Sequence, residues 1–436
     1  MPEKHNAERR ERYTKAVEQL GSKEAPVRIG GVYTLVGLVD EWLLDENLDY
    51  TEKVREGQVI INSLCAYIRS SFALAFHYDE LTQESPTAEG LYKNREQEFY
   101  IDKAALESEA DIRLSIIKEI HDRLQSPEIN TPGAWSDFEY DFSGSTFFYP
   151  IDFTRSYYTK PVKFSGSTYQ DEVRFDGSVY KDEADFGSSI YKSWATFDGS
   201  TYTGWVGFNC STYQSWADFS ASTYQDGATF MSSTYQSWAD FSNSTYQSEV
   251  YFSDSTYKGK ADFCGSTYQN EVYFSYSTYQ NEVYFSGSTY EDKTDFNGSI
   301  FCGDVYYGKD RYNSNFSRFT ECTPQFYNEN SHQNTLFGSP NNNFIVDTDK
   351  GYPINLNSEG LPLGCKFLTS EQKEYLADKF REVDETKNKF REVKDTEGNA
   401  IFVNTPLSLN GEIRVWREKV TTVKTEDNTA PEKEDN

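Results

Sequence analysis

The sequence predicts a mixed fold, in which an α-helical N-terminal domain is followed by a β-helix and then by a small α+β C-terminal region. Three observations lead to this prediction. Apolar residues recur at helical spacing through positions 1–133, an aromatic residue returns at every eleventh position from Phe142 onward, and this repeat loses its register after position 312. The predicted boundaries are 1–133, 134–325 and 326–424, followed by an acidic tail at 425–436 whose charged composition predicts disorder.

The N-terminal domain contains four segments with the apolar pattern of helices. They are predicted at residues 9–20, 27–44, 51–76 and 102–124. In the third of them, Val54, Leu64 and Ile68 belong to the apolar positions at helical spacing. Antiparallel pairing of such helices predicts a small HEAT- or armadillo-like domain.

The repeat contains most of the 33 tyrosines and 31 phenylalanines of the chain. One aromatic residue recurs from Phe142 to Tyr307, and a second follows five residues after each, so that the spacing alternates between five and six over 16 units. A serine precedes the second aromatic residue by two positions from Ser145 through Ser299, and a small apolar residue precedes most of the first ones in the same way. Because residues i−2 and i of an extended chain point to one side, each segment offers one small and one large inward side chain.

Four such segments, of five, six, five and six residues, form one coil of twenty-two residues. Each coil thus contains two units of the repeat, and the 16 units predict eight coils. Backbone hydrogen bonds would then run from coil to coil, and the interior would be filled by stacked rings. One coil cannot bury its rings alone, so stability would come from contacts between neighbouring coils.

This pattern resembles the pentapeptide-repeat family, whose units read roughly (Ala/Ser/Val)-(Asp/Asn)-(Leu/Phe)-(Ser/Thr)-X. Residues 239–243 (ADFSN) match one unit and residues 244–248 (STYQS) match the next. Every second unit has one extra residue, as in an aromatic-rich variety within the family whose repeat is eleven residues long. The resemblance implies a right-handed quadrilateral β-helix with four short faces per coil. The region before the repeats is also similar to that of bacterial, especially actinobacterial, members.

The C-terminal region is expected to cap the open end of the β-helix, where unpaired strand edges would otherwise be exposed. Phe319 and Phe326 are interpreted as decayed repeats. Thr369 predicts the start of a helix that continues to about Arg381 or further. Strands are predicted at 400–404 and 412–420.

The candidate binding residues point outward from the predicted coils. Trp194, Trp216 and Trp238 follow one another at an interval of one full coil and should stack on one corner of three successive coils. A second column on the same side contains Asp218, Asp240, Asp262, Tyr284 and Tyr306. A similar pair on the opposite side contains Tyr251 and Tyr273. Exposed rings beside carboxylates are typical of a partner-binding stripe, although flat rings also stack along any β-solenoid without binding anything.

Composition excludes several other classes of function. The net charge of −28 argues against direct nucleic-acid binding as a property of the whole chain. No apolar run of about 18 residues exists, so no membrane span is expected. The four histidines are far apart, and there is no GxSxG, GxGxxG or GxxxxGK[ST] motif. We therefore predict no catalytic residues, no cofactor and no metal site. Six scattered cysteines and a charged N-terminus favour a cytoplasmic location.

The favoured function is that of a non-catalytic bacterial scaffold that binds an unidentified protein partner, and homodimerisation stays open. The resemblance also implies an alternative, because some pentapeptide-repeat proteins act as acidic DNA mimics on gyrase. A third hypothesis, binding of sugars or ice, rests only on an outward column of threonines. These are Thr212, Thr234, Thr256 and Thr278.

Overall fold

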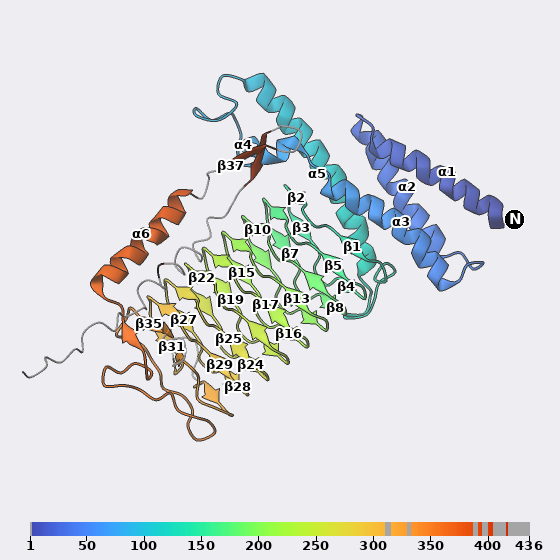
Figure 1. Cartoon of the computed structure of the whole chain (residues 1–436). Coiled ribbons are helices and arrows are strands. Elements are labelled where there is room, and N and C mark those ends of the chain that lie inside the picture. The colour runs from blue at the N-terminus through green and yellow to red at the C-terminus, as the bar shows by residue number, and fades with distance from the viewer. Residues whose placement is uncertain are drawn as a thin grey trace, which may run out of the picture.

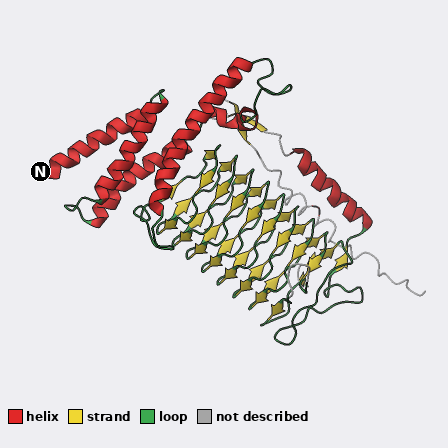
Figure 2. Cartoon of the chain, turned by 180° about the vertical axis from the view of Figure 1, so that it is seen from behind, coloured by secondary structure: helices red, strands yellow, loops and turns green. Residues whose placement is uncertain are grey.

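The computed structural model describes residues 2–309, 315–328, 333–386, 391–394 and 400–403, together with Trp416. N-terminal helices are followed by a solenoid of short parallel strands over residues 140–306 and by a C-terminal region with a helix beside the solenoid (Figures 1 and 2). The predicted mixed fold is therefore confirmed. The predictions for 412–420 and for the tail at 425–436 fall outside the described residues, except for Trp416.

The N-terminal helices pack around the apolar helix α2. Their bounds are α1 (Pro2–Leu20), α2 (Ala25–Leu43), α3 (Tyr50–Arg69), the 3-10 helix η1 (Ala73–His77), α4 (Tyr78–Leu81) and α5 (Glu96–Leu124). Helix α2 contacts α1, α3 and α5, and its Leu35 and Leu38 are fully buried. Helices α1 and α2 approach closely at Gly31, where a Cβ would lie 2.9 Å from the carbonyl oxygen of Ala16. The assignment to a HEAT- or armadillo-like class stays a prediction.

Helix α3 ends at Arg69, well before the predicted end at 76. A distant helix binds the carbonyls at this end, because Arg113 of α5 donates from Nη1 to the carbonyl of Ile68 (2.7 Å) and from Nη2 to that of Ser70 (2.9 Å). These carbonyls belong to the end of α3, where helical partners run out. The apolar periodicity of residues 51–76 could not predict this contact, because Arg113 is distant in the sequence.

Among the described residues, no single helix is long and apolar enough to cross a membrane. Helix α3 together with residues 73–81 meets the length and composition only as a pair, which is bent by 44°.

Four parallel sheets form the four sides of the solenoid, and each strand pairs with the strand one coil further along the chain. Sheet A contains β1 (Tyr140–Asp141), β5 (Val162–Lys163), β9 (Ala184–Asp185), β13 (Val206–Gly207), β17 (Ala228–Thr229), β21 (Val250–Tyr251), β25 (Val272–Tyr273) and β29 (Thr294–Asp295). Sheet C, on the opposite side, contains β3 (Ile151–Asp152), β7 (Val173–Arg174), β11 (Ala195–Thr196), β15 (Ala217–Asp218), β19 (Ala239–Asp240), β23 (Ala261–Asp262), β27 (Val283–Tyr284) and β31 (Val305–Tyr306).

The other two sides are built in the same way. Sheet B contains β2 (Thr146–Phe147), β6 (Thr168–Tyr169), β10 (Ile190–Tyr191), β14 (Thr212–Tyr213), β18 (Thr234–Tyr235), β22 (Thr256–Tyr257), β26 (Thr278–Tyr279), β30 (Ile300–Phe301), β35 (Leu336–Phe337) and β36 (Lys366–Phe367). Sheet D contains β4 (Tyr157–Tyr158), β8 (Val179–Tyr180), β12 (Thr201–Tyr202), β16 (Thr223–Tyr224), β20 (Thr245–Tyr246), β24 (Thr267–Tyr268), β28 (Thr289–Tyr290) and β32 (Arg318–Phe319). The predicted length of one coil and the number of eight coils are confirmed.

Columns of stacked rings fill the interior, as the repeat predicts. Within a column, Phe219 and Phe241 are 5.0 Å apart with an interplanar angle of 3°. Between columns, Phe208 meets Phe219 edge to face at 5.0 Å and 73°. Both arrangements are favoured by the quadrupoles of the rings.

Inward serines connect neighbouring coils. The amide of Ser211 donates to Oγ of Ser233 (3.1 Å), and the Ser233 hydroxyl donates to the carbonyl of Phe208 (3.2 Å). The same two contacts recur along sheets B and D. The serine therefore satisfies backbone groups at a buried corner, which explains its place in the repeat.

At the C-terminal end of the solenoid, Phe319 completes the eighth coil on sheet D, and Phe326 begins a ninth, interrupted coil. Phe319 stacks on Tyr290 at 4.6 Å and Phe326 stacks on Phe296 at 4.9 Å, so the interpretation of both as decayed repeats is confirmed. The period alone would place Tyr312 on Tyr290, but an insertion gives this position to Phe319, and Tyr312 falls outside the described residues.

Helix α6 (Ser370–Thr386) lies along the sheet B side of the solenoid (Figure 1). Its predicted start is confirmed, because Thr369 Oγ1 accepts the amide of Gln372 (3.2 Å) while Gln372 Oε1 accepts that of Thr369 (2.9 Å). Strand β38 (Ala400–Val403) agrees with the strand predicted at 400–404, and it pairs with β37 (Arg391–Lys394).

The predicted outward threonine column lies on the side where α6 packs. Leu376 and Phe380 of α6 join a buried cluster with Ile300 of sheet B. On the same side, Thr256 and Thr278 are only 1% and 2% exposed. The column is therefore not an open surface, which removes the observation behind the sugar or ice hypothesis.

Candidate partner-binding face

The three predicted tryptophans lie at the same place in three successive coils. Each one directly precedes a strand of sheet C, and these strands pair in register, with Ala195 opposite Ala217 and Ala217 opposite Ala239. We call Trp194, Trp216 and Trp238 the tryptophan ladder. Its straight course follows from a repeat that contains no insertion between these coils.

The ladder is exposed at both ends and half-buried in the middle. Trp194 is 53% exposed and Trp238 is 45% exposed. The rings of Trp194 and Trp216 meet edge to face at 6.0 Å and 78°, whereas Trp216 and Trp238 are stacked at 6.1 Å and 26°. The Nε1 group of Trp216 is buried without a hydrogen-bond partner.

Asp218, Asp240 and Asp262 form a column beside the ladder, in register on β15, β19 and β23. Each carboxylate accepts the backbone amide two residues further on. The distance is 2.9 Å from Ser220 to Asp218, from Ser242 to Asp240 and from Cys264 to Asp262. The aspartates therefore also hold the turn after each strand, which is a structural role that Asp commonly has in turns.

Tyr284 and Tyr306 continue this column and stack at 5.1 Å. Their hydroxyls donate to the acid two residues earlier, from Tyr284 to Glu282 (3.2 Å) and from Tyr306 to Asp304 (3.0 Å). Tyr284 is only 4% exposed. The two tyrosines thus continue the column, but their hydroxyl groups are already hydrogen-bonded to acids of the same chain.

The pair predicted on the opposite side is also present. Tyr251 and Tyr273 of sheet A stack at 5.0 Å with an interplanar angle of 2°. Their hydroxyls donate to Glu249 and Glu271. This arrangement repeats the acid–tyrosine contact of sheet C.

Two carboxylates beside the ladder, Asp240 and Asp198, have raised pKa values. Burial, together with the nearby charges of Asp262 and Asp218, raises the pKa of Asp240 to about 6, although the amide and hydroxyl of Ser242 oppose this rise. Burial and the charges of Asp218 and Asp176 raise the pKa of Asp198 to about 6.

Asp198 is not among the predicted site residues. It lies two positions beyond the outward residue of β11, and Asp176 occupies the same place one coil earlier. The 22-residue period could therefore have predicted that Asp198 belongs to a column on this side. We call Trp194, Trp216, Trp238, Asp198, Asp218 and Asp240 the acidic tryptophan face. Residues 193–257 contain six acids and neither Lys nor Arg.

Replacing Asp240 with asparagine is expected to raise the free energy of unfolding at a pH of about 7.5 by about 1–2 kcal/mol. The gain is limited to this size because solvent screens the charge of a partly exposed group. The folded-state pKa lies above the ordinary value of 3.8. The folded protein therefore binds this proton more tightly than the unfolded chain, and stability falls as the pH rises from about 4 to about 6. Asparagine removes that loss and keeps an oxygen for the Ser242 amide.

Chemical denaturation of both proteins at several pH values measures this effect. The advantage of Asp240→Asn should vanish near pH 4, where both side chains are neutral. Asp226→Asn, an exposed acid on another corner, is the control and should change stability by less than about 0.5 kcal/mol. An equal advantage at low and high pH would contradict the assigned cause.

Trp205 offers a comparison on the sheet A side. It is 39% exposed, and its ring covers two glycines. A Cβ at Gly207 would lie 2.5 Å from its Cη2, and one at Gly227 would lie 3.3 Å from its Cδ1. Trp205 is therefore an isolated ring that lies against the sheet, whereas the ladder forms a row.

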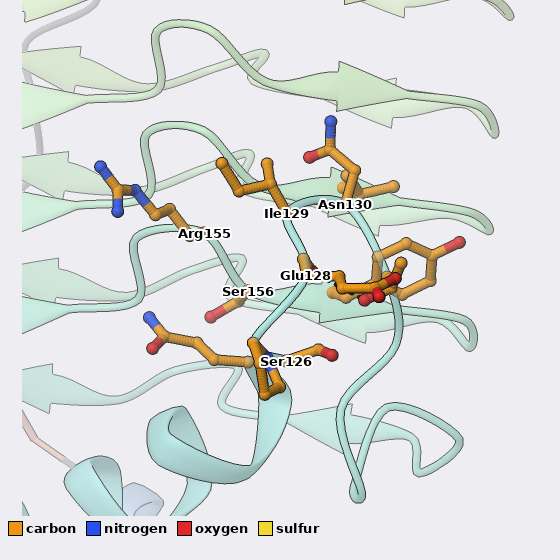
Figure 3. Close-up of a pocket in the computed structure, with 11 residues that line it drawn as sticks. Ser126, Glu128, Ile129, Asn130, Arg155 and Ser156 are labelled. Carbon is orange, nitrogen blue, oxygen red and sulfur yellow. Dashed lines mark hydrogen bonds between the residues drawn. The ribbon is translucent and has the colours of Figure 1, made fainter.

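A small pocket lies where the loop after α5 crosses the first coils, and its volume is about 140 Å³ (Figure 3). It is lined by Gln125, Ser126, Pro127, Glu128, Ile129, Asn130, Thr131, Arg155, Ser156, Tyr157 and Val179. Glu128 is the single carboxylate, and neither histidine, lysine nor cysteine joins it in the lining. The hydroxyl groups of its lining come from Ser126, Thr131, Ser156 and Tyr157.

A larger cavity of about 460 Å³ lies between α3 and the first coil. Its lining includes Cys65, and burial raises the pKa of this thiol to about 12, which keeps it protonated and unreactive. Arg69 in the same lining donates to Asp141. Across the described part of the chain, no group of three or more His, Cys, Asp or Glu side chains could hold a metal ion.

Comparison with known proteins returned no match from protein families, curated proteins or solved structures. A function is therefore inferred from the geometry of the acidic tryptophan face.

Proposed function

We propose that the protein is a non-catalytic β-solenoid scaffold that binds another protein through the acidic tryptophan face. The observation that carries the proposal is the row of three tryptophans on three successive coils, exposed at both ends and fixed on a rigid sheet. Tryptophan is enriched among the residues that dominate binding energy at protein interfaces. A face held by parallel strands loses little conformational freedom when a partner binds.

The exposure of the ladder, rather than the angle between its rings, distinguishes it from the other outward rings. The outward ring of Tyr284 on the same sheet is only 4% exposed. Trp194, by contrast, is 53% exposed although it meets the ring of Trp216 edge to face. Exposing indole in this way forgoes hydrophobic stabilisation, which a partner would recover.

We further propose that the chain is an aromatic-rich member of the pentapeptide-repeat family and that it acts in the bacterial cytoplasm. The four parallel sheets and the regular pairing of each strand with its equivalent in the next coil support the family proposal. The six cysteines are scattered through the sequence without a CxxC pair, which supports a reducing compartment.

The DNA-mimic alternative is less favoured by the distribution of charge. Sheet D, one of the four sides, presents a row of neutral threonines along its outward positions from Thr201 to Thr289. A duplex mimic needs negative charge along its length. Inhibition of gyrase supercoiling at micromolar protein would favour this alternative over the scaffold.

Replacing Trp194, Trp216 and Trp238 together with serine is expected to abolish capture of a specific partner from a lysate of the source cells. The loss should exceed about tenfold, because each buried tryptophan at an interface is worth about 2 kcal/mol or more. Quantitative mass spectrometry of pull-downs measures it. Trp205→Ser is the matched control, since it removes an exposed indole from another sheet. Unchanged partners with an intact fold would refute the proposal.

A further inference from the structure

We propose that the acidic tryptophan face binds an extended segment of its protein partner that carries arginine at alternate positions. This inference rests on the proposed function and names the chemistry of the partner. Three properties of the face support it: the spacing of the ladder, its straight course and the carboxylates beside it.

The spacing of the ladder matches an extended chain. Its ring centroids are 6.0 and 6.1 Å apart. Alternate residues of a β-strand are about 6.6–6.8 Å apart and point to the same side. Three alternate side chains can therefore meet the three rings one after another.

The straight course of the ladder distinguishes a strand from a helix. Residues i and i+4 of a helix also rise by about 6 Å, but each step turns by about 40° around the helix axis. The three tryptophans each directly precede one of three strands that pair in register, so they follow the column of these strands and do not turn in this way. An extended segment that runs along the solenoid keeps its alternate side chains on one line.

The charge of the face selects a cation. Residues 193–257 contain neither Lys nor Arg. The neighbouring columns of sheet C contain Arg174 and Lys260, and each of these already forms an ion pair with an acid. Arg174 lies 3.5 Å from Asp176, and Lys260 lies 2.5 Å from Glu282. Asp198, Asp218 and Asp240 have no cationic partner among the described ion pairs.

Arginine suits this face better than lysine. A planar guanidinium can stack on an indole ring and donate to a carboxylate at the same time. Trp216 and Trp238 each stand two residues before an aspartate, so ring and carboxylate alternate across the face. Partial burial of Asp240 strengthens the attraction to such a cation because solvent screens it less.

Binding should weaken in acid. A bound guanidinium needs ionised carboxylates, and Asp198 and Asp240 take up protons near pH 6. The other charged groups around them are Asp176, Asp218 and Asp262, with Arg174 at one side. Loss of both charges at a pH of about 5 is expected to weaken binding about fivefold to tenfold.

Fluorescence anisotropy with labelled synthetic peptides tests the inference on the full chain. The probe has the sequence Arg-Ser-Arg-Ser-Arg, and its isomer has three adjacent arginines followed by two serines. We expect the alternating peptide to bind at least about fivefold more tightly than the isomer and than its lysine counterpart. Trp216→Ser should weaken binding about tenfold, Asp198→Asn and Asp240→Asn together should remove the pH dependence, and Trp205→Ser should leave affinity unchanged.

The outcomes separate this inference from the proposed function. Equal binding of both arginine isomers, or tighter binding of a helical peptide with arginines four residues apart, would overturn the extended mode. If no arginine peptide binds while the triple serine variant still loses its partner, the partner chemistry is wrong and the proposed function stands. If the triple variant keeps its partner, both fail.

Discussion

Replacing Phe219 with alanine is expected to lower the free energy of unfolding by about 3–5 kcal/mol, the usual cost of deleting a buried aromatic ring. Phe219 is fully buried and stacks between Phe197 at 5.1 Å and Phe241 at 5.0 Å. It also meets Phe208 and Phe230 edge to face. Because each coil is stabilised by its neighbours, a cavity in a central coil weakens two interfaces at once.

Guanidinium denaturation followed by circular dichroism measures this loss. Phe219→Leu fills part of the same space and should cost less, so the effect can still be measured if the alanine variant does not fold. Thr223→Ala, a nearby outward residue of sheet D, serves as the control and should change stability by less than about 0.5 kcal/mol. A loss below about 1 kcal/mol for Phe219→Ala would show that the central rings are not closely packed.

Replacing Arg113 with alanine is expected to destabilise the N-terminal helices by about 3–5 kcal/mol, because it removes one of the two arginine partners of buried Glu109, the other being Arg28, and leaves the buried carbonyl of Ile68 without this donor. Arg113 is 1% exposed, and its Nε donates to Glu109 (2.8 Å), which is 3% exposed. Its other nitrogens bind the end of α3, and its guanidinium lies over the ring of Phe148 at 5.5 Å. One side chain thus joins α5, α3 and the first coil.

Hydrogen exchange measured by mass spectrometry would locate this effect. Faster exchange is expected in α3, α5 and the first coil, while the central coils should exchange as before. Arg113→Lys restores the charge but not the planar fork that reaches three acceptors, so it should recover only part of the stability. If exchange in α3 is unchanged in the alanine variant, Arg113 does not hold the end of that helix.

The solenoid could be predicted from the sequence in detail, because the contacts that define it join residues at equivalent places in neighbouring coils. Phe219 meets Phe241 for the same reason that Ala217 pairs with Ala239. A strictly periodic chain repeats its local conformation, and the period then specifies both register and the direction of each side chain. The tryptophan ladder could be placed in the same way.

The flanking regions follow no period, and the sequence predicted them less well. The end of α3 is held by Arg113, and the last side of the eighth coil depends on an insertion that replaces Tyr312 with Phe319 above Tyr290. These contacts join segments that no spacing rule relates. The same holds for Asp198, whose position could be found from the period but whose burial could not.

The sequence by itself therefore determined the coil, its period, its inward rings and serines, and the row of outward tryptophans. Only the tertiary structure decided where α3 ends, which side α6 covers and which carboxylates have raised pKa values. The physical reason is the range of the interactions. Contacts between neighbouring coils recur at one fixed separation and are visible in the sequence as a repeat, whereas docking and desolvation depend on single contacts between segments that are distant in the chain.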